Sequence, residues 1–489
     1  MNPKKILIPK NESDSLFNLF FRYFALFRLS DGKIIAVNKK TREWIYVRKK
    51  EVICSKLRQL YYSLETQTVS KNTVNTTYDM IKSISDNCND SIDFINILGQ
   101  TETQITFNIS GTDSYVLIDK NSVKLEKKSK SKLIFNNISC HPIYPDINNV
   151  DNSKYFNYLQ TLFNVDETQL ILFGVYIVSL FIKNINHPLL LLSGDYGAAK
   201  TTTAKKIIKI LKPDGNLTQM SKNIDDVAVL LSNEYLVGFD NVSKEVFTRE
   251  MADLICSAVT GSTYQKRKLY TNDEISSLHI HNSIIVNGLD LHLPYNDLTD
   301  RSITINFKRI DDKNRLTEKQ IWDEFYELLP KLQGCIFCVI SKAMNTYNNT
   351  QLKVLPRLAD FAQWGYAIAE TIETGLGNEF LQQYFENIRA SSMIAIDNDC
   401  LLSTLQDLMA EVDYWEGTAT DLLTTLRNIY YTKNAVNILP KGFPLAANTL
   451  SRRLNSLTVE LKTMGLSLAI GRDSNRYINI TKIGGNTNE

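Results

Sequence analysis

The segment Pro188-Leu-Leu-Leu-Leu-Ser-Gly-Asp-Tyr-Gly-Ala-Ala-Lys-Thr-Thr202 decides the fold prediction. It begins with a short, continuously apolar run, which is typical of a strand buried on both faces of a parallel sheet. The small residues that follow fit the pattern G-x-x-x-x-[GA]-K-[ST], with alanine in place of the last glycine, and a helix is predicted from 204 to 211. Backbone N–H groups in such a turn can wrap closely around phosphates. The sequence therefore predicts a phosphate-binding loop between a strand and a helix.

The predicted ligand of this loop is ATP with Mg²⁺. Lys200 would reach the β- and γ-phosphates, and the hydroxyl of Thr201 would ligate the metal. All nine loop residues are candidates for nucleotide contact: Gly194, Asp195, Tyr196, Gly197, Ala198, Ala199, Lys200, Thr201 and Thr202.

Two later apolar runs also end in polar residues with an expected role at this site. Asp240 follows one run and can hold Mg²⁺ together with Thr201; the alternative is that it is only a turn residue. Asn241 stands where ring ATPases usually carry the glutamate that polarises the attacking water, so the water-activating residue stays unassigned. Asn287 ends the next run, where its amide can orient water against the γ-phosphate.

An arginine precedes the last of the predicted strands. Arg301 comes immediately before the run 303–307, and it can either pair with Asp297 or Asp300 or project into a neighbouring subunit's nucleotide. Such arginine fingers are worth 10³ to 10⁵ in rate. Because helical segments separate the earlier apolar runs, we expect a mainly parallel, doubly wound sheet.

The chain is long enough for two to four domains, with 489 residues. Its 43% hydrophobic and 22% charged residues exclude wholesale disorder, and a net charge of +2 means that any nucleic-acid site must come from local clustering. The predicted fold is a multidomain α/β chain with four parts: a small α+β domain at 1–150, the ATPase core at 151–310, a helical lid at 311–391 and a winged helix at 392–489.

The N-terminal part is expected to contain short strands, polar connectors, a helix at 49–65 and a small meander between 104 and 135. The segment 124–132 carries a net charge of +4, which indicates either a solvated hairpin edge or a nucleic-acid contact. Two apolar stretches, 16–29 and 170–182, are too short or too charged for membrane spans. Both predict buried helices of a cytoplasmic protein without membrane contact.

The seven cysteines follow no framework spacing, which favours a reducing compartment. Cys335 and Cys338 form a CxxC, which can bind zinc or do redox work. They lie in an apolar run without a second such pair nearby, and free cysteine is among the most buried residue types. Helix packing is therefore the favoured interpretation.

Candidate DNA contacts lie in two regions. Lys266, Arg267 and Lys268 stand beside tyrosines before the strand that ends at Asn287, and this combination suits a single strand as well as a solvated loop. The C-terminal region predicts helices at 401–411, 419–430 and 449–464 and a hairpin after them. Its DNA candidates lie off the apolar stripe of the third helix and in the hairpin: Arg452, Arg453, Asn455, Arg472 and Arg476. Such folds also serve protein contacts.

The order of these motifs resembles a known family. Together with Leu355-Pro-Arg-Leu-Ala-Asp-Phe-Ala-Gln-Trp364 and Trp415-Glu-Gly-Thr-Ala-Thr420, they look like the MCM-like AAA+ proteins of mobile genetic elements, which include replication initiator-helicases of pathogenicity islands and cassette chromosomes. The resemblance extends from about Phe17 onward. It implies an AAA+ (P-loop ASCE) core, Arg301 as an arginine finger acting in trans, Arg357 as a lid sensor touching the γ-phosphate, a basic hairpin in a central channel and a hexameric ring around DNA. Ala199 and Asn241 depart from the family pattern.

The function expected from these patterns is an ATP-driven DNA helicase that also helps to recognise a replication origin. Its partners would be single-stranded DNA, origin duplex, further copies of the chain and other replication proteins. The alternative is a DNA-bound switch or helicase loader, in which ATP controls assembly without processive unwinding. Asn241 keeps this alternative open.

Overall fold

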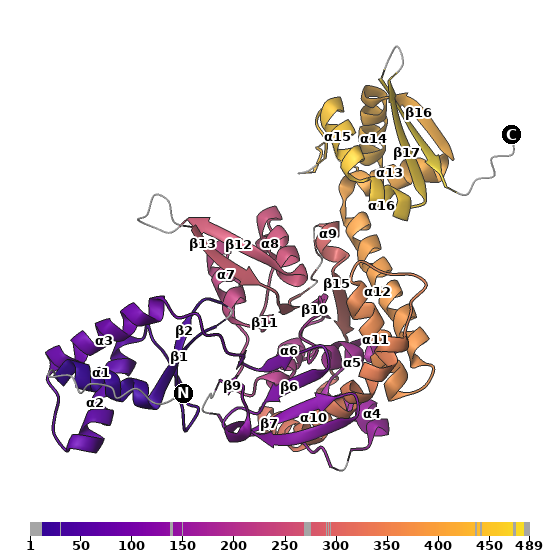
Figure 1. Cartoon of the computed structure of the whole chain (residues 1–489). Coiled ribbons are helices and arrows are strands. Elements are labelled where there is room, and N and C mark those ends of the chain that lie inside the picture. Colours follow the sequence, from indigo (N-terminus) through magenta and orange to yellow (C-terminus); the bar gives the residue numbers. More distant parts are fainter. Residues whose placement is uncertain are drawn as a thin grey trace.

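The structure is a computed structural model that describes residues 12–29, 31–136, 140–148, 150–267, 275–289, 291, 293, 295–435, 438–440, 443–472 and 476–483. Three parts follow one another along the chain: an N-terminal lobe, a central α/β body and a C-terminal domain joined to the body through a long helix (Figure 1). None of the helices in this described part combines the length and apolar character needed to cross a bilayer.

The N-terminal lobe packs three helices on a small antiparallel sheet. The sheet has the order β1-β2-β3, so β3 is an edge strand. The bounds of these elements are α1 (Glu12–Tyr23), β1 (Phe24–Arg28), β2 (Ile34–Asn38), β3 (Trp44–Tyr46), α2 (Lys50–Glu65) and α3 (Lys71–Asp86).

Two predictions for this lobe were wrong. The stretch 16–29 is a helix only as far as Tyr23, and then becomes strand β1, in which Phe24 and Leu26 alternate with less buried residues and pair with β2. The polar stretch after 70 is the helix α3, not a connector. Val74, Tyr78 and Ile81 recur at helical spacing and are buried, and the side chain of Ser70 caps the first turn.

The predicted meander forms a four-stranded antiparallel sheet with the order β5-β6-β7-β8. Its strands are β5 (Leu98–Gln100), β6 (Gln104–Asn108), β7 (Ser114–Asp119) and β8 (Ser122–Lys127), while β4 (Phe94–Ile95) pairs with β9 (Ile134–Phe135). This sheet shares one apolar core with the central body. The basic stretch here is only partly solvated, because Lys128 is buried and its Nζ donates to the carbonyl of Ile109 at 2.9 Å. Burial lowers the pKa of Lys128 to about 8.

The central body contains the predicted parallel sheet, and that prediction is confirmed. All four strands are parallel in the order β11-β14-β10-β15. The strands are β10 (Leu189–Gly194), β11 (Leu236–Phe239), β14 (Ser283–Asn287) and β15 (Ser302–Phe307). The helices around them include α4 (Tyr155–Leu162), α5 (Glu167–Ser179), α6 (Lys200–Leu211), α7 (Ile224–Asn233) and α8 (Arg249–Thr260). The predicted buried helix at 170–182 corresponds to α5, whose residues from Leu172 onward are buried.

Long helices follow the sheet, as the sequence predicted from residue 316 onward. They are α10 (Glu318–Asn349), α11 (Ala359–Ile372) and α12 (Leu376–Asn398). Cys335 and Cys338 lie in α10, where Cys335 is 2% exposed in the main core. No cluster of three or more metal-ligating side chains occurs among the described residues, and helix packing is confirmed for Cys335.

The C-terminal domain has its own apolar core, built from helices and a three-stranded antiparallel sheet with the order β16-β18-β17. The predicted third helix is divided at Leu457 into two shorter helices. The elements are α13 (Cys400–Glu411), β16 (Tyr414–Thr418), α14 (Ala419–Asn434), α15 (Ala447–Ser456), α16 (Thr458–Thr463), β17 (Leu466–Arg472) and β18 (Arg476–Lys482).

Candidate functional site

The predicted phosphate-binding loop connects β10 to α6 at the carboxyl edge of the parallel sheet. Gly194, Gly197 and Ala199 all have positive φ angles, of 133°, 74° and 62°. Glycine adopts such angles at little cost, and alanine is the smallest residue that still pays a steric penalty there. No side chain caps the amino end of α6, so its first backbone N–H groups are available to an anion.

Lys200 opens α6 and folds back over the loop. Its Nζ donates to the carbonyls of Gly194 and Asp195, both at 2.6 Å. Burial lowers the pKa of Lys200, partly offset by the charge of Asp195. The ammonium group thus lies over the concave side of the loop, where a phosphate would replace the two carbonyls as its partner.

Hydrogen bonds connect the first turn of α6 to the end of β11, and the end of β11 to the end of β14. The Thr201 hydroxyl donates to Oδ1 of Asp240 at 2.9 Å, and the backbone N–H of Asn241 donates to Oδ1 of Asn287 at 2.8 Å. The Nδ2 of Asn287 is buried without a partner within the described structure. Four predicted residues from three elements therefore meet at one edge of the sheet, and one of them has an unused donor.

The backbone at Asn241 explains part of its departure from the family pattern. Its φ angle is 50°, in the left-handed region, which asparagine tolerates better than most other residues. A glutamate at this position would be strained in the same backbone. The described residues thus show an amide, and not a carboxylate, beside Asp240.

The segment after β15 also lies against the loop, and sequence reasoning missed it. The N–H of Ile310 approaches the carbonyl of Gly197 at 3.4 Å, and a Cβ on Gly197 would lie 3.2 Å from Nη2 of Arg315. A hydrogen bond to Asn164 also holds the segment after β15 in place, because Nδ2 of Asn164 donates to the carbonyl of Lys308 at 2.8 Å. Arg315 is not part of any recognisable sequence motif. Its position beside Gly197 in the structure makes it a candidate for contact with a phosphate or ribose.

We expect Arg315→Ala to weaken nucleotide affinity about tenfold, because it removes one charge-assisted hydrogen bond worth about 1.5 kcal/mol. Titration with a fluorescent nucleotide measures this. Arg309→Ala is the matched control, since Arg309 and Arg315 both pair with Asp312, at 3.7 and 3.1 Å, and only Arg315 borders Gly197. Equal affinities in the two variants would exclude Arg315 from the site.

The two other predicted arginines lie together, but away from the loop. Arg301 and Arg357 both pair with Oδ1 of Asp297 at 2.6 Å, and Arg357 also approaches Asp300 at 3.8 Å. The side chain of Arg301 is 13% exposed, that of Arg357 42%. Burial raises the pKa of Asp297, but the hydrogen bond and charge of Arg301 outweigh it, so that the pKa is lowered. Arg301 therefore forms the ion pair with Asp297 that was one of the two roles expected for it from the sequence.

The strand register shows how far these arginines are from the loop of their own chain. Leu189 pairs with Ser302 and Gly194 with Phe307, so Arg301 precedes the amino end of β15 while the loop follows the carboxyl end of β10. Five residue steps at about 3.3 Å separate the two ends by roughly 16 Å. An arginine side chain cannot bridge this distance, so neither arginine completes the site of its own subunit in this arrangement.

The predicted hairpin is present as β12 (Ser262–Arg267) and β13 (Ile275–Ile280), and it projects from the body (Figure 1). Lys266 already has an ion-pair partner within the chain, because its Nζ pairs with Asp225 of α7. The hydroxyl of Tyr264 donates to the same carboxylate at 3.0 Å. Arg267 ends β12, and nothing is described of its side chain. Lys268 lies outside the described residues.

The candidate DNA-binding residues of the C-terminal domain differ in whether their side chains are exposed or already paired. Arg452 and Asn455 are exposed on α15. Arg453 instead forms an ion pair with Asp399 at 2.6 Å, and Asp399 caps α13 by accepting from two backbone N–H groups. Arg472 and Arg476 are paired at the end of the β17–β18 hairpin, with side chains outside the described part.

The sequence matches the AICE RepA family, described as the actinomycete integrative conjugative element replication protein, over residues 157–388, and the AICE RepA C-terminal domain over residues 401–488. Together the two matches cover well over half of the chain. The chain therefore belongs to the AICE RepA family of replication proteins of mobile elements.

Solved structures with low sequence identity also resemble the chain. One is described as "SCCmec type IV Cch - active helicase", with 12% identity, a TM-score of 0.47 and coverage of 94% of this chain and 93% of that one. Another is the apo structure of the NrS-1 C-terminal region, with 12% identity, a TM-score of 0.43 and coverage of 96% and 99%. No curated protein sequence matches the chain.

Proposed function

We propose that this chain is an ATP-dependent DNA helicase that initiates replication of a mobile genetic element. The observation that carries the proposal is the hydrogen-bonded set Thr201–Asp240 and Asn241–Asn287 beside Lys200, at the carboxyl edge of a parallel sheet. Ligands of α/β sheets bind at this edge. Membership of a family of replication proteins supports DNA as the substrate on which the energy of ATP is used.

The residues present fit ATP and Mg²⁺. The glycines keep the loop free of side chains where phosphates would lie, Lys200 supplies positive charge, and the hydroxyl of Thr201 and the carboxylate of Asp240 are hard oxygen ligands already 2.9 Å apart. Bound Mg²⁺ neutralises charge on the β- and γ-phosphates. The unpaired Nδ2 of Asn287 can hold the attacking water or a γ-phosphate oxygen.

The site becomes complete only between subunits in this proposal. Arg301 and Arg357 lie together at the end of the sheet opposite to the loop. We infer that they meet the nucleotide of a neighbouring copy. A closed ring repeats one head-to-tail contact, which brings the arginine end of each copy to the loop of the next. A hexamer around DNA is the assembly we propose, with an AAA+ core, the helices α10–α12 as lid and a winged helix at the C-terminus.

A second candidate function is an ATP-controlled DNA-binding switch or helicase loader. Asn241 favours it, because the hydrogen-bonded set at the loop contains no residue that activates the attacking water. A strand-displacement assay on forked DNA discriminates the two functions. ATP-dependent displacement is the result expected of the helicase, whereas DNA-stimulated hydrolysis without displacement would establish the switch.

The two adjacent arginines of α15 should have different roles in the C-terminal domain. We expect Arg453→Ala to lower the stability of this domain by about 1 to 2 kcal/mol, because Asp399 loses its charged partner. Arg452→Ala should leave stability unchanged and weaken binding to duplex DNA, since Arg452 is exposed. Thermal unfolding and duplex titration at one salt concentration measure the two effects. Equal unfolding temperatures in the two variants would contradict this division.

A further inference from the structure

Exposed apolar side chains lie beside both halves of the proposed shared site. Among the large hydrophobic residues in the described part of the chain, six are at least 60% exposed: Tyr62, Tyr196, Val354, Leu355, Ile438 and Leu445. Tyr196 belongs to the phosphate-binding loop, and Val354 and Leu355 come within three residues of Arg357. A single exposed hydrophobic residue needs no explanation, but adjacent ones mark a contact surface. Three of these six border either the loop or the arginine pair.

The first surface is the pair Val354 and Leu355, in the segment that joins α10 to α11. These side chains are 65% and 61% exposed, whereas Leu358, which follows them, is 2% exposed in the main core. Arg357 fixes this end of the segment through its ion pair with Asp297 at 2.6 Å. Three residue steps span at most about 10 Å, so the apolar pair stays close to Arg357.

The second surface lies at the phosphate-binding loop. Tyr196 is 77% exposed within the loop, and Leu316 is 51% exposed directly after Arg315. Arg315 lies against the loop, since a Cβ on Gly197 would be 3.2 Å from its Nη2. Tyr196 and Leu316 therefore flank the loop, one from within it and the other from the segment after β15.

The two apolar surfaces cannot cover each other within one subunit. The loop follows the carboxyl end of β10, whereas Arg301 precedes the amino end of the neighbouring strand β15. The two ends of β10 are roughly 16 Å apart. A head-to-tail contact between copies that brings the arginines to the next loop also brings the two surfaces to one interface. Burial of apolar surface in that interface is favourable.

We propose that Val354 and Leu355 of one copy pack against Tyr196 and Leu316 of the next copy, and that this apolar contact holds the shared ATP site together. This inference rests on the proposed shared site. Apolar side chains that surround a polar contact exclude water from it. With water excluded, the attraction between the arginines and the phosphates of a neighbour's nucleotide becomes stronger.

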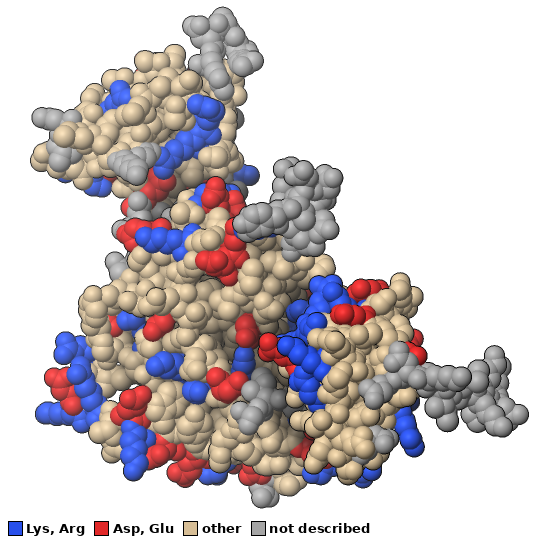
Figure 2. Space-filling model, turned by 90° about the vertical axis from the view of Figure 1, so that its left-hand side faces the viewer, with Lys and Arg blue, Asp and Glu red and all other residues tan. Residues whose placement is uncertain are grey.

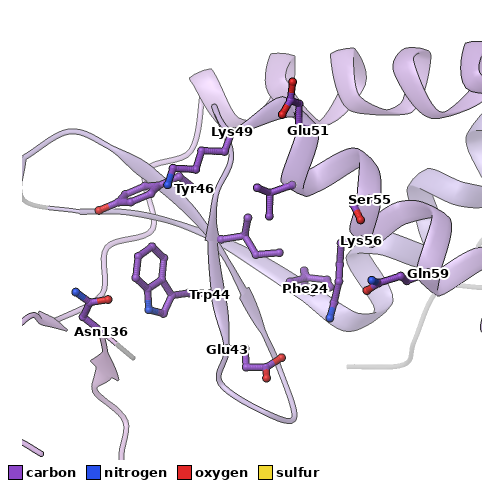
Figure 3. Close-up of a pocket in the computed structure, with 12 residues that line it drawn as sticks. Phe24, Glu43, Trp44, Tyr46, Lys49, Glu51, Ser55, Lys56, Gln59 and Asn136 are labelled. Atoms are coloured by element: carbon purple, nitrogen blue, oxygen red, sulfur yellow. The ribbon is translucent and has the colours of Figure 1, made fainter. Parts of the chain in front are cut away.

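The N-terminal lobe also exposes apolar side chains, but its surface is basic. Tyr62 and Leu64 are 60% and 49% exposed on α2, the helix that forms one wall of a groove of about 740 Å³ with β3 (Figure 3). Residues 31–60 contain nine lysines and arginines against three acidic residues, a net charge of +6. Figure 2 shows Lys and Arg side chains gathered on this lobe beside the hollow that separates it from the body. Like charge opposes contact between two such lobes, so Tyr62 and Leu64 provide the control.

The test is sedimentation velocity of the full chain over a range of concentrations, with a non-hydrolysable ATP analogue. Val354→Asp with Leu355→Asp should raise the concentration at which half of the chain is assembled at least about tenfold, because two apolar anchors are replaced by charges. Tyr62→Asp with Leu64→Asp makes the same change on the N-terminal lobe and should assemble like the wild type. Both double variants should keep the wild-type unfolding temperature, since the four side chains are exposed.

The hydrolysis rate separates loss of assembly from loss of a catalytic group. At a concentration that half-assembles the wild type, Val354→Asp with Leu355→Asp should hydrolyse ATP at least about fivefold more slowly, and a tenfold higher concentration should restore part of the rate. A rate that stays low when the variant is fully assembled would overturn the inference, because the two residues would then act within the site and not in assembly.

Photo-cross-linking identifies what covers the apolar pair. A benzoylphenylalanine placed at Leu355 is mixed with isotopically labelled wild-type chain and irradiated, and mass spectrometry locates the products. Cross-links to Tyr196 or Leu316 of the labelled copy are expected. Cross-links only to the C-terminal domain of the same chain, or wild-type assembly by Val354→Asp with Leu355→Asp, would overturn the inference and leave the shared site standing. A wild-type chain that stays monomeric with nucleotide and DNA would overturn the shared site as well.

Discussion

Lys200→Ala is expected to reduce ATP hydrolysis to the background level, a loss of at least about 10²-fold, while the chain stays folded. Among the described residues, the ammonium group donates to two loop carbonyls, and neither Gly194 nor Asp195 is buried, so its removal leaves no buried group unpaired there. It does remove the charge that would stabilise the transferring phosphoryl group, and such electrostatic terms are among the largest in catalysis. Steady-state phosphate release with saturating single-stranded DNA measures the loss.

Lys205→Ala is the matched control for this variant. Lys205 belongs to the same helix, three residues beyond Thr202, the last of the loop residues, and has no assigned role at the site. Its hydrolysis rate should equal that of the wild type. Turnover by Lys200→Ala at the wild-type rate would mean that the loop is not the site of hydrolysis.

Arg301→Ala is expected to bind ATP with near-normal affinity and hydrolyse it about 10³-fold more slowly. Arg301 precedes the amino end of β15, and the two ends of the neighbouring strand β10 are roughly 16 Å apart, so nucleotide binding to the loop of the same subunit should not depend on Arg301. The lost charge would instead stabilise the transition state of a neighbour's nucleotide. Nucleotide titration and phosphate release, measured on the same preparation, separate binding from hydrolysis.

The ion pair with Asp297 requires its own control, because a largely buried arginine also stabilises the fold. Asp297→Asn removes the charged partner of both Arg301 and Arg357 but keeps the two guanidinium groups. We expect its hydrolysis rate to fall less than tenfold. A loss as large as that of Arg301→Ala would assign Arg301 a structural role only.

The sequence was sufficient to predict the parts of the fold that depend on short-range patterns. The strand, loop and helix from 189 to 211 follow from a continuous apolar run, small residues and a helical stretch in direct succession. Asp240 and Asn287 could be placed near Thr201 because parallel strands bring their carboxyl ends to one edge. The hairpin at 262–280 was expected only from the resemblance to a known family.

The features that the sequence did not reveal depend on long-range contacts. Arg315 lies beside Gly197, more than a hundred positions away, and nothing in its neighbourhood forms a motif. Lys128 looked like part of a solvated basic edge, but the fold turns it inward onto Ile109. The ion pair between Arg357 and Asp297 also arises only when distant segments pack together. The helix α3 is different, since the spacing of its buried residues was available in the sequence.

Mixing two inactive variants tests the central claim of the account, that each hydrolytic site is shared between two copies of the chain. Lys200→Ala keeps Arg301, and Arg301→Ala keeps the loop, so a mixed assembly contains some interfaces in which both are intact. We predict that hydrolysis reappears on mixing, and that it varies with the mixing ratio as the number of such interfaces varies. If subunit exchange is confirmed by energy transfer between labelled copies and no ratio restores hydrolysis, the shared site is contradicted.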